Sequence, residues 1–152
     1  FYLAVYSAMN LGAFSIISIV ERDDKGTRFT DYRGFSDNHP WLAILMCLFM
    51  ISLAGFPPTA GFIAKYGLLS AAAANGYIWL VIIAVVNTLL SAYYYLRIIV
   101  NMYMRNEEDT VKSRYSGIKH VFIGLLALML LILGVIPGFL LKIVDKTAIT
   151  VF

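Results

Sequence analysis

The sequence predicts an all-α integral membrane protein with four transmembrane helices, the second of which is discontinuous. Its composition is 61% hydrophobic and only 14% charged, and its mean hydropathy is +0.79. A soluble domain carries about a quarter charged residues. The chain has 12 basic and 9 acidic residues, and among them only Lys65 and Arg97 lie inside the long apolar stretches. Such stretches, with the charges at their ends, are typical of a protein that crosses the bilayer several times.

Four apolar segments follow one another along the chain. They belong to one membrane domain, residues 1–152, and we expect helices at about 2–20, 40–74, 77–104 and 120–141. Polar loops at 21–39 and 105–119 follow the first and third segments. The first residue is Phe1 and not a methionine, and no cleavable signal pattern precedes the first segment. We interpret the chain as the C-terminal part of a longer polypeptide.

The second segment is too long for one straight transmembrane helix. As a continuous helix, residues 40–74 would extend about 50 Å, against a hydrocarbon core of about 30 Å. Two consecutive prolines lie at its centre, and they cannot sit inside an unbroken helix because each lacks the backbone N–H and clashes with the preceding turn. We therefore expect a helix break, either between two spans or within one span, formed by Gly55, Pro57, Pro58 and Gly61.

The distribution of basic residues favours one broken span. With one span, loops 21–39 and 105–119 lie on the same side of the membrane, and the uncharged Asn75-Gly76 turn lies on the other. With two spans, the basic residues would be shared equally between the sides. Because cytoplasmic loops carry an excess of Lys and Arg, we predict that both polar loops are cytoplasmic. The C-terminus is then on the outer side.

The composition also excludes other classes of function. The positive charges behind the net charge of +3 lie mainly in the loops, which indicates orientation in a membrane and not nucleic-acid binding. Cys47 is the single cysteine, so the sequence contains neither a disulfide framework nor an iron–sulfur ligand set. Glycine-rich nucleotide-binding motifs are absent from the sequence. We expect no cofactor and no metal on this chain.

Lys65 is the strongest candidate for a functional residue. It lies about two helical turns beyond the Pro-Pro break and far from both charged loops. A lysine inside a membrane costs about 2.5–3.5 kcal/mol on insertion scales, so it is by default a functional hypothesis. A helix break also exposes backbone carbonyls and amides, which have to line a cavity or bind water. The alternative is a lysine that extends outward to the lipid headgroups.

Other polar residues near Lys65 are weaker candidates. The third segment carries a polar stripe at helical spacing, which predicts a face toward other helices or water: Asn87, Ser91, Tyr94, Ile98 and Asn101, with Thr88 and Tyr95 nearby. Hydrogen bonds between helices explain this stripe as well as a proton path does. For Arg97 we favour a side chain that extends toward the cytoplasmic interface. From polarity and position, the candidates to hold water near Lys65 are Ser52, Thr59, Tyr66 and Tyr94.

The residues around the break resemble a known family of membrane proteins. Residues 52–66, which read SLAGFPPTAGFIAKY, look like the broken-helix motif of the antiporter-like subunits of respiratory complex I. These subunits are relatives of Mrp-type cation/proton antiporter subunits. Within the family, residues 91–97 (SAYYYLR), residues 31–34 (DYRG) and the opening of the chain are similar to the subunit N group. The resemblance spans nearly the whole chain and is weaker after Arg105.

The resemblance implies a fold of fourteen helices, of which this chain supplies the last four. It implies that Lys65 is the central lysine of the second broken helix, where subunit M has a glutamate, and that Lys65 titrates during proton translocation. The chain is then a non-redox subunit of a proton-translocating NADH:quinone oxidoreductase in the inner membrane of a bacterium. Its partners are lipid and the neighbouring antiporter-like subunits of the membrane arm. Flavin, iron–sulfur clusters and quinone are expected on other subunits.

Three other functions are compatible with the same residues. An Mrp-type antiporter subunit has the same broken helix and lysine, but an ion gradient drives it. In a purely structural membrane scaffold, Lys65 would only be paired and buried. In an unrelated symporter, the broken helix would bind a solute, and transport would depend on that solute. Copurification with flavin and iron–sulfur subunits separates the first alternative from the oxidoreductase.

Overall fold

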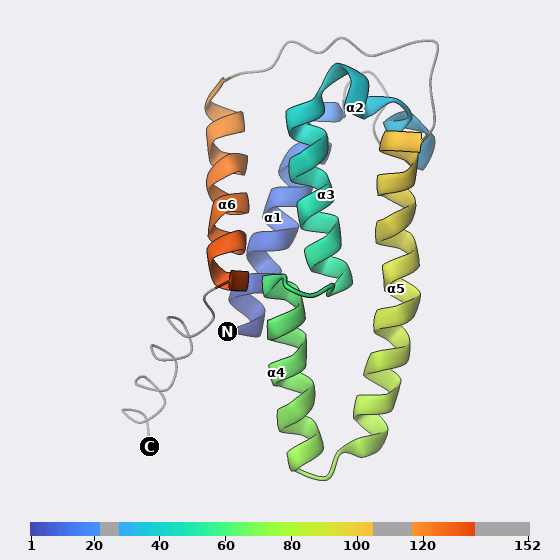
Figure 1. The fold of residues 1–152 in the computed structure, drawn as a ribbon, viewed down its shortest axis with the longest axis vertical. Helices are drawn as coiled ribbons and strands as arrows, with labels where there is room; N and C mark the ends of the chain where they lie inside the picture. Colours follow the sequence, from blue (N-terminus) through green and yellow to red (C-terminus); the bar gives the residue numbers. More distant parts are fainter. Residues whose placement is uncertain (22–27, 105–116, 136–152) are drawn as a thin grey trace.

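The computed structural model describes residues 1–21, 28–104 and 117–135, and within these ranges every regular element is a helix (Figure 1). This confirms the predicted all-α class. Two short elements, η1 (Phe29–Tyr32) and α2 (Phe35–Asn38), lie between the first and second long helices. The long helices are α1 (Tyr2–Val20), α3 (Pro40–Ala54), α4 (Ala60–Ala74), α5 (Ile78–Met104) and α6 (Gly117–Val135).

The predicted discontinuous segment consists of α3 and α4. Figure 1 shows that α4 continues in the direction of α3 after the break, and that α5 returns alongside both. The turn from α4 to α5 therefore lies at the opposite end of the molecule from α2 (Figure 1). Each half has 15 residues, or about 22 Å of helix, so neither half alone matches a hydrocarbon core of about 30 Å. The two halves therefore follow one another in the same direction, with the break between them.

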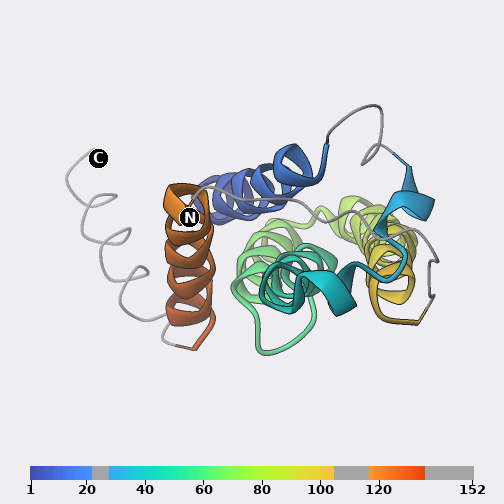
Figure 2. The ribbon, with the colours of Figure 1, turned by 90° about the horizontal axis from the view of Figure 1, so that it is seen from above.

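The other helices surround the α3–α4 pair. Seen from above, α6 and α5 flank the pair on opposite sides, and α1 covers a third side (Figure 2). The face of α1 that packs inward repeats at steps of four and three, as an α-helix requires: Val5, Met9, Gly12 and Ile16 are all buried. Gly12 permits a close approach, because a Cβ on this residue would overlap the ring of Phe49 on α3.

Beyond the break, the α4–α5 hairpin has few buried residues. On α4 the buried residues all lie within its first five positions, and on α5 they are Asn101 and Met102 near its far end. Large apolar side chains are exposed between these points, and Trp79 is 79% exposed. By length and composition, α1 and α5 are each able to cross a membrane, whereas α3, α4 and residues Val121–Gly134 of α6 are shorter apolar helices.

The described part of the polar loop after α1, residues 28–39, packs against the helices through η1 and α2. Tyr32 of η1 and Phe35 of α2 are both buried, and their rings meet edge to face with centroids 6.1 Å apart. The hydroxyl of Ser36 donates a hydrogen bond of 2.8 Å to the carbonyl of Met102 on α5. Tyr32 and Phe35 are separated by polar or small residues and do not form a helical repeat of apolar positions. The sequence therefore did not predict that they are buried. These contacts attach the loop to the end of α5.

The ends of the predicted helices differ from the observed ones by a few residues. The third helix begins at Ile78, one residue later than predicted, and α6 begins at Gly117 instead of 120. Residues 136–141 of the predicted fourth helix lie outside the described residues, as does most of the predicted loop 105–119. Arg97 extends toward the end of α5 that meets the first loop, where its guanidinium lies 5.0 Å from the centroid of the Phe29 ring.

Gly134 fixes α6 against the break. A Cβ on Gly134 would lie 2.8 Å from the amide nitrogen of Ala60 and 2.9 Å from the carbonyl oxygen of Pro58. These are backbone atoms and cannot rotate away, so we expect Gly134→Ala to lower the free energy of unfolding by about 1–3 kcal/mol. Thermal denaturation of the full-length protein in detergent measures this change. In the matched control, Gly124→Ala on the same helix, the new Cβ meets no atom within 4 Å. Equal denaturation temperatures for both variants would contradict this packing.

Candidate functional site

The first half of the broken helix ends at Gly55. This residue has a φ of 85°, in the left-handed region that favours glycine. Its N–H donates to the carbonyls of Ile51 and Ser52, both at 3.1 Å, and the N–H of Phe56 donates to the carbonyl of Ile51 at 3.2 Å. This is the Schellman pattern of a helix end. The turn occupies the carbonyls of Ile51 and Ser52 and leaves that of Leu53 for another partner.

The second half begins at Thr59. Its hydroxyl accepts a hydrogen bond of 3.4 Å from the N–H of Phe62 and donates one of 2.6 Å to the carbonyl of Phe56. Ser52, which is buried, joins the two halves, because its hydroxyl accepts a hydrogen bond of 3.2 Å from the N–H of Gly61. The break is therefore a defined turn in which side chains replace the hydrogen bonds that a continuous helix would make.

Lys65 reaches back across the break. Its Nζ donates a hydrogen bond of 2.9 Å to the carbonyl oxygen of Leu53 in the last turn of α3. The stem of the lysine passes close to Gly55, where a Cβ would lie 3.3 Å from Lys65 Cδ. Among the described residues, no carboxylate forms an ion pair with this ammonium. The C-terminal end of α3 carries the negative end of the helix dipole. The positive charge of Lys65 therefore faces this helix end.

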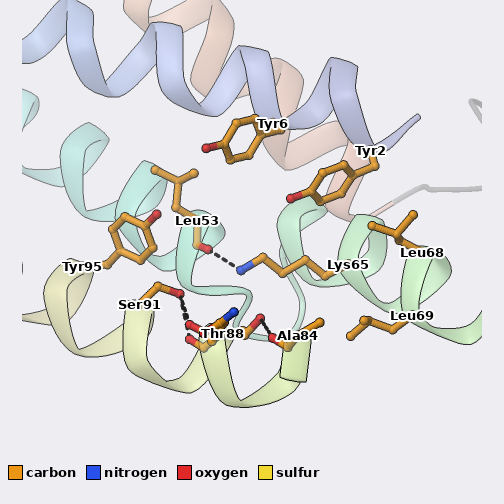
Figure 3. Close-up of a pocket in the computed structure, with 11 residues that line it drawn as sticks. Tyr2, Tyr6, Leu53, Lys65, Leu68, Leu69, Ala84, Thr88, Ser91 and Tyr95 are labelled. Atoms are coloured by element: carbon orange, nitrogen blue, oxygen red, sulfur yellow. Dashed lines mark hydrogen bonds between the residues drawn. The ribbon is translucent and has the colours of Figure 1, made fainter. Parts of the chain in front are cut away.

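The amine of Lys65 opens onto a cavity of about 310 Å³. One wall comes from α1, another from α5, and the rest from the two halves of the broken helix (Figure 3). This volume is large enough for several water molecules, since one water occupies about 30 Å³ in the liquid. The lining residues are Tyr2, Tyr6, Leu53, Lys65, Leu68, Leu69, Ala84, Asn87, Thr88, Ser91 and Tyr95.

The structure brings together only some of the residues that the sequence analysis selected. Ser52 and Thr59 belong to the break and do not line the cavity. Tyr66 and Tyr94 are 65% and 57% exposed and also lie outside its lining. Lys65 lines the cavity together with Asn87 and Ser91 of the predicted polar stripe. The water-holding role of the other four residues stays a prediction.

Sequence reasoning missed Tyr2 and Tyr6 as cavity residues and placed Tyr95 only beside the polar stripe. Tyr2 and Tyr6 lie one turn apart on α1, and their rings stack with centroids 5.8 Å apart. Tyr95 comes from α5 and adjoins Tyr94, which points elsewhere. The i, i+4 spacing of the first pair showed that both residues share a helix face. It could not show that this face meets Lys65.

The fold and the site together define a class of helical membrane protein in which a discontinuous helix places an ionisable side chain beside a polar cavity. A family model described as "NADH:quinone oxidoreductase/Mrp antiporter, TM" matches residues 1–91. The chain belongs to this family. The match includes the break, Lys65 and most of the cavity lining.

Individual relatives agree with this assignment. The chain is 41% identical over 141 residues to the NADH-quinone oxidoreductase subunit N of Nitrosomonas europaea, which covers 92% of this chain and 29% of that protein. It is 42% identical over 148 residues to subunit N of Trichlorobacter lovleyi, covering 96% and 30%. The chain thus spans about 30% of the length of these relatives. The resemblance to the subunit N group is confirmed.

A solved structure shows the same fold. The chain is similar to one chain of the respiratory complex I from Thermus thermophilus with bound aureothin, with a TM-score of 0.82 and 30% sequence identity. The match covers 93% of this chain and 32% of that chain. The arrangement of helices around the break is therefore shared with a chain of respiratory complex I.

Proposed function

We propose that this chain forms part of subunit N of a proton-translocating NADH:quinone oxidoreductase and that Lys65 carries a proton through it. The observation that carries the proposal is the position of the Lys65 amine. It lies at a helix break, bonded to the Leu53 carbonyl and open to a cavity with polar walls. The family and the subunit N relatives support the same function.

The chemistry of the site suits reversible protonation. The ammonium form of Lys65 is stabilised by the carbonyl of Leu53 and the dipole of α3. Lys65 is half-buried, and no carboxylate among the described residues forms an ion pair with it. A proton on this amine is therefore held by a neutral carbonyl and not by an opposite charge, as a group that passes protons on requires. In this proposal electron transfer, with flavin, iron–sulfur clusters and quinone, takes place on other subunits.

We further propose the topology of the chain in the membrane. It crosses four times, with α3 and α4 as one broken span, and supplies the last four helices of a fourteen-helix subunit beside neighbouring antiporter-like subunits. Two features support one broken span: α4 continues in the direction of α3, and α5 then runs back alongside both. The basic loops then face the cytoplasm of a bacterium, and the C-terminus lies on the outer side of the inner membrane.

The proposal is tested with Lys65→Ala in the full-length subunit of the assembled complex, reconstituted in sealed vesicles. We expect proton pumping to fall by about tenfold or more at this site, either alone or together with electron transfer, because coupling links the two. The amount of assembled complex is measured separately. Ser70→Ala, an exposed position on the same helix, is the control. An assembled Lys65→Ala complex with normal turnover and proton stoichiometry would contradict the proposal.

A further inference from the structure

Two kinds of hydroxyl group line the Lys65 cavity, aliphatic hydroxyls and phenols. They differ in whether the hydroxyl proton is already donated to another protein group. We propose that protons reach and leave Lys65 through the phenols of Tyr2 and Tyr95, assisted by Tyr6, and not through the aliphatic hydroxyls of Thr88 and Ser91. This inference rests on the proposed function, since it names the route by which the same lysine exchanges its proton. It assigns a relay role to residues that lie outside the break motif.

The aliphatic hydroxyls already donate their protons to backbone carbonyls. Thr88 Oγ1 donates a hydrogen bond of 2.9 Å to the carbonyl of Ala84, and Ser91 Oγ donates to the carbonyls of Asn87 and Thr88 at 2.8 and 3.0 Å. All of these acceptors belong to α5 itself, as is common for Ser and Thr inside helices. Such a hydroxyl accepts a hydrogen bond from water, but it passes a proton on only after its bond to the helix breaks.

The phenols of the cavity do not donate their protons to backbone carbonyls of the described residues. Within the described part of the chain, no hydrogen bond joins the phenol oxygen of Tyr2, Tyr6 or Tyr95 to another protein group, and all three line the cavity. Figure 3 shows Tyr2 of α1 and Tyr95 of α5 on opposite sides of the Lys65 amine, with the phenol oxygen of Tyr2 directed toward it. A phenol both donates and accepts hydrogen bonds. These groups are therefore free to bond to water and to turn between partners.

The phenols also lie on two different walls of the cavity, so a proton can move along either wall. Tyr2 and Tyr6 are held as a stacked pair on α1, with an angle of 15° between their rings. Tyr95 extends from α5, so the cavity has a phenol on each side of the broken helix. The amide of Asn87 also lines the cavity, but an amide gives up a proton only through an unfavourable tautomer. The phenols are thus the groups best suited to relay.

The relay step leaves the phenol unchanged. The Lys65 ammonium transfers one N–H proton to a water, and that protonated water transfers a proton to the oxygen of a phenol. The phenol releases its original O–H proton to the next water. Lys65 is left as a neutral amine, which still has an N–H to donate to the Leu53 carbonyl. One proton has moved, and no bond other than O–H and N–H has been made or broken.

The test makes Tyr2→Phe, Tyr95→Phe and the variant that combines both, and compares them with Thr88→Val and Ser91→Ala. Each phenylalanine keeps the ring and removes only the relay oxygen, so assembly is preserved. The variants are made in the full-length complex and reconstituted in sealed vesicles. We expect proton-coupled turnover to fall by about tenfold or more in the double variant, with a larger solvent isotope effect in heavy water. Thr88 and Ser91 line the same cavity, and their variants are expected to lower proton-coupled turnover much less than the double tyrosine variant does.

Lys65→Ala, measured in parallel, separates the two proposals. If Lys65→Ala lowers pumping but both tyrosine variants match the unmodified complex, the relay is wrong and the proposed function stands. If Thr88→Val or Ser91→Ala slows proton-coupled turnover as much as the tyrosine variants do, the selectivity for phenols is also wrong. If Lys65→Ala pumps normally, the proposed function itself fails, and the relay fails with it.

Discussion

Replacing Lys65 with arginine is expected to leave the complex assembled and to stop proton transfer at this site. A guanidinium has five N–H donors and is long enough to reach the Leu53 carbonyl, so the bond across the break is kept. The cavity of about 310 Å³ beside the amine has room for the larger head group. A guanidinium does not release its proton in proteins, because its pKa lies above about 12. The charge therefore becomes permanent.

We expect the Lys65→Arg complex to show a fall in proton pumping as large as that of Lys65→Ala, about tenfold or more. The two variants differ in stability. Arginine retains a donor for Leu53, whereas alanine leaves that carbonyl without its partner, which costs about 1–3 kcal/mol if water does not replace it. Pumping in sealed vesicles and thermal denaturation in detergent measure the two effects. Normal pumping by Lys65→Arg would show that the positive charge matters and its titration does not.

Gly61→Ala is expected to destroy the geometry of the break. A Cβ on Gly61 would overlap the carbonyl oxygen of Ser52 and lie 2.7 Å from its carbonyl carbon. These are backbone atoms of the last turn of α3, so the two half-helices would have to move apart. This movement would lengthen the bond between Gly61 N–H and Ser52 Oγ, now 3.2 Å, and shift α4 together with Lys65. Overpacking of this kind costs about 1–3 kcal/mol or more.

The expected result for Gly61→Ala is a lower yield of assembled complex and loss of pumping in what assembles. The matched control is Gly67→Ala on the same helix, where the added Cβ meets no atom within 4 Å. Alanine favours a helix over glycine by about 1 kcal/mol, so the control is expected to be at least as stable as the unmodified protein. The measurements are the amount of assembled complex in the membrane and its denaturation temperature. Normal assembly of Gly61→Ala would show that the half-helices do not pack as closely as described.

Much of the site was predictable because its signals are local in the sequence. The Pro57-Pro58 pair and the flanking glycines fix where the helix breaks, since proline lacks the donor that a helix interior requires. Lys65 stands out because a charge inside an apolar run is rare and costly. The structure places the break between Ala54 and Ala60, inside the predicted range, and Lys65 beside it.

The candidates chosen only by proximity in the chain were less informative. Tyr66 follows Lys65 directly, but neighbours in a helix point about 100° apart, and its side chain is directed away from the cavity. Tyr94 and Tyr95 differ in the same way: Tyr94 is exposed, and Tyr95 lines the cavity. Both have the same chemistry and almost the same position. What separates them is the rotation of α5 against its neighbours, which the spacing of one helix does not determine.

The sequence by itself determined the all-α class, the break near Gly55, the isolated lysine and the two polar loops. Each follows from hydropathy or backbone chemistry over a few consecutive residues. Only the tertiary structure decided that Leu53 accepts the bond from Lys65 and that Tyr2, Tyr6 and Tyr95 share its cavity. These contacts join residues on different helices, or on the two sides of the break. They depend on how far each helix is rotated and shifted against its neighbours. The packing of all the helices together determines that rotation and shift.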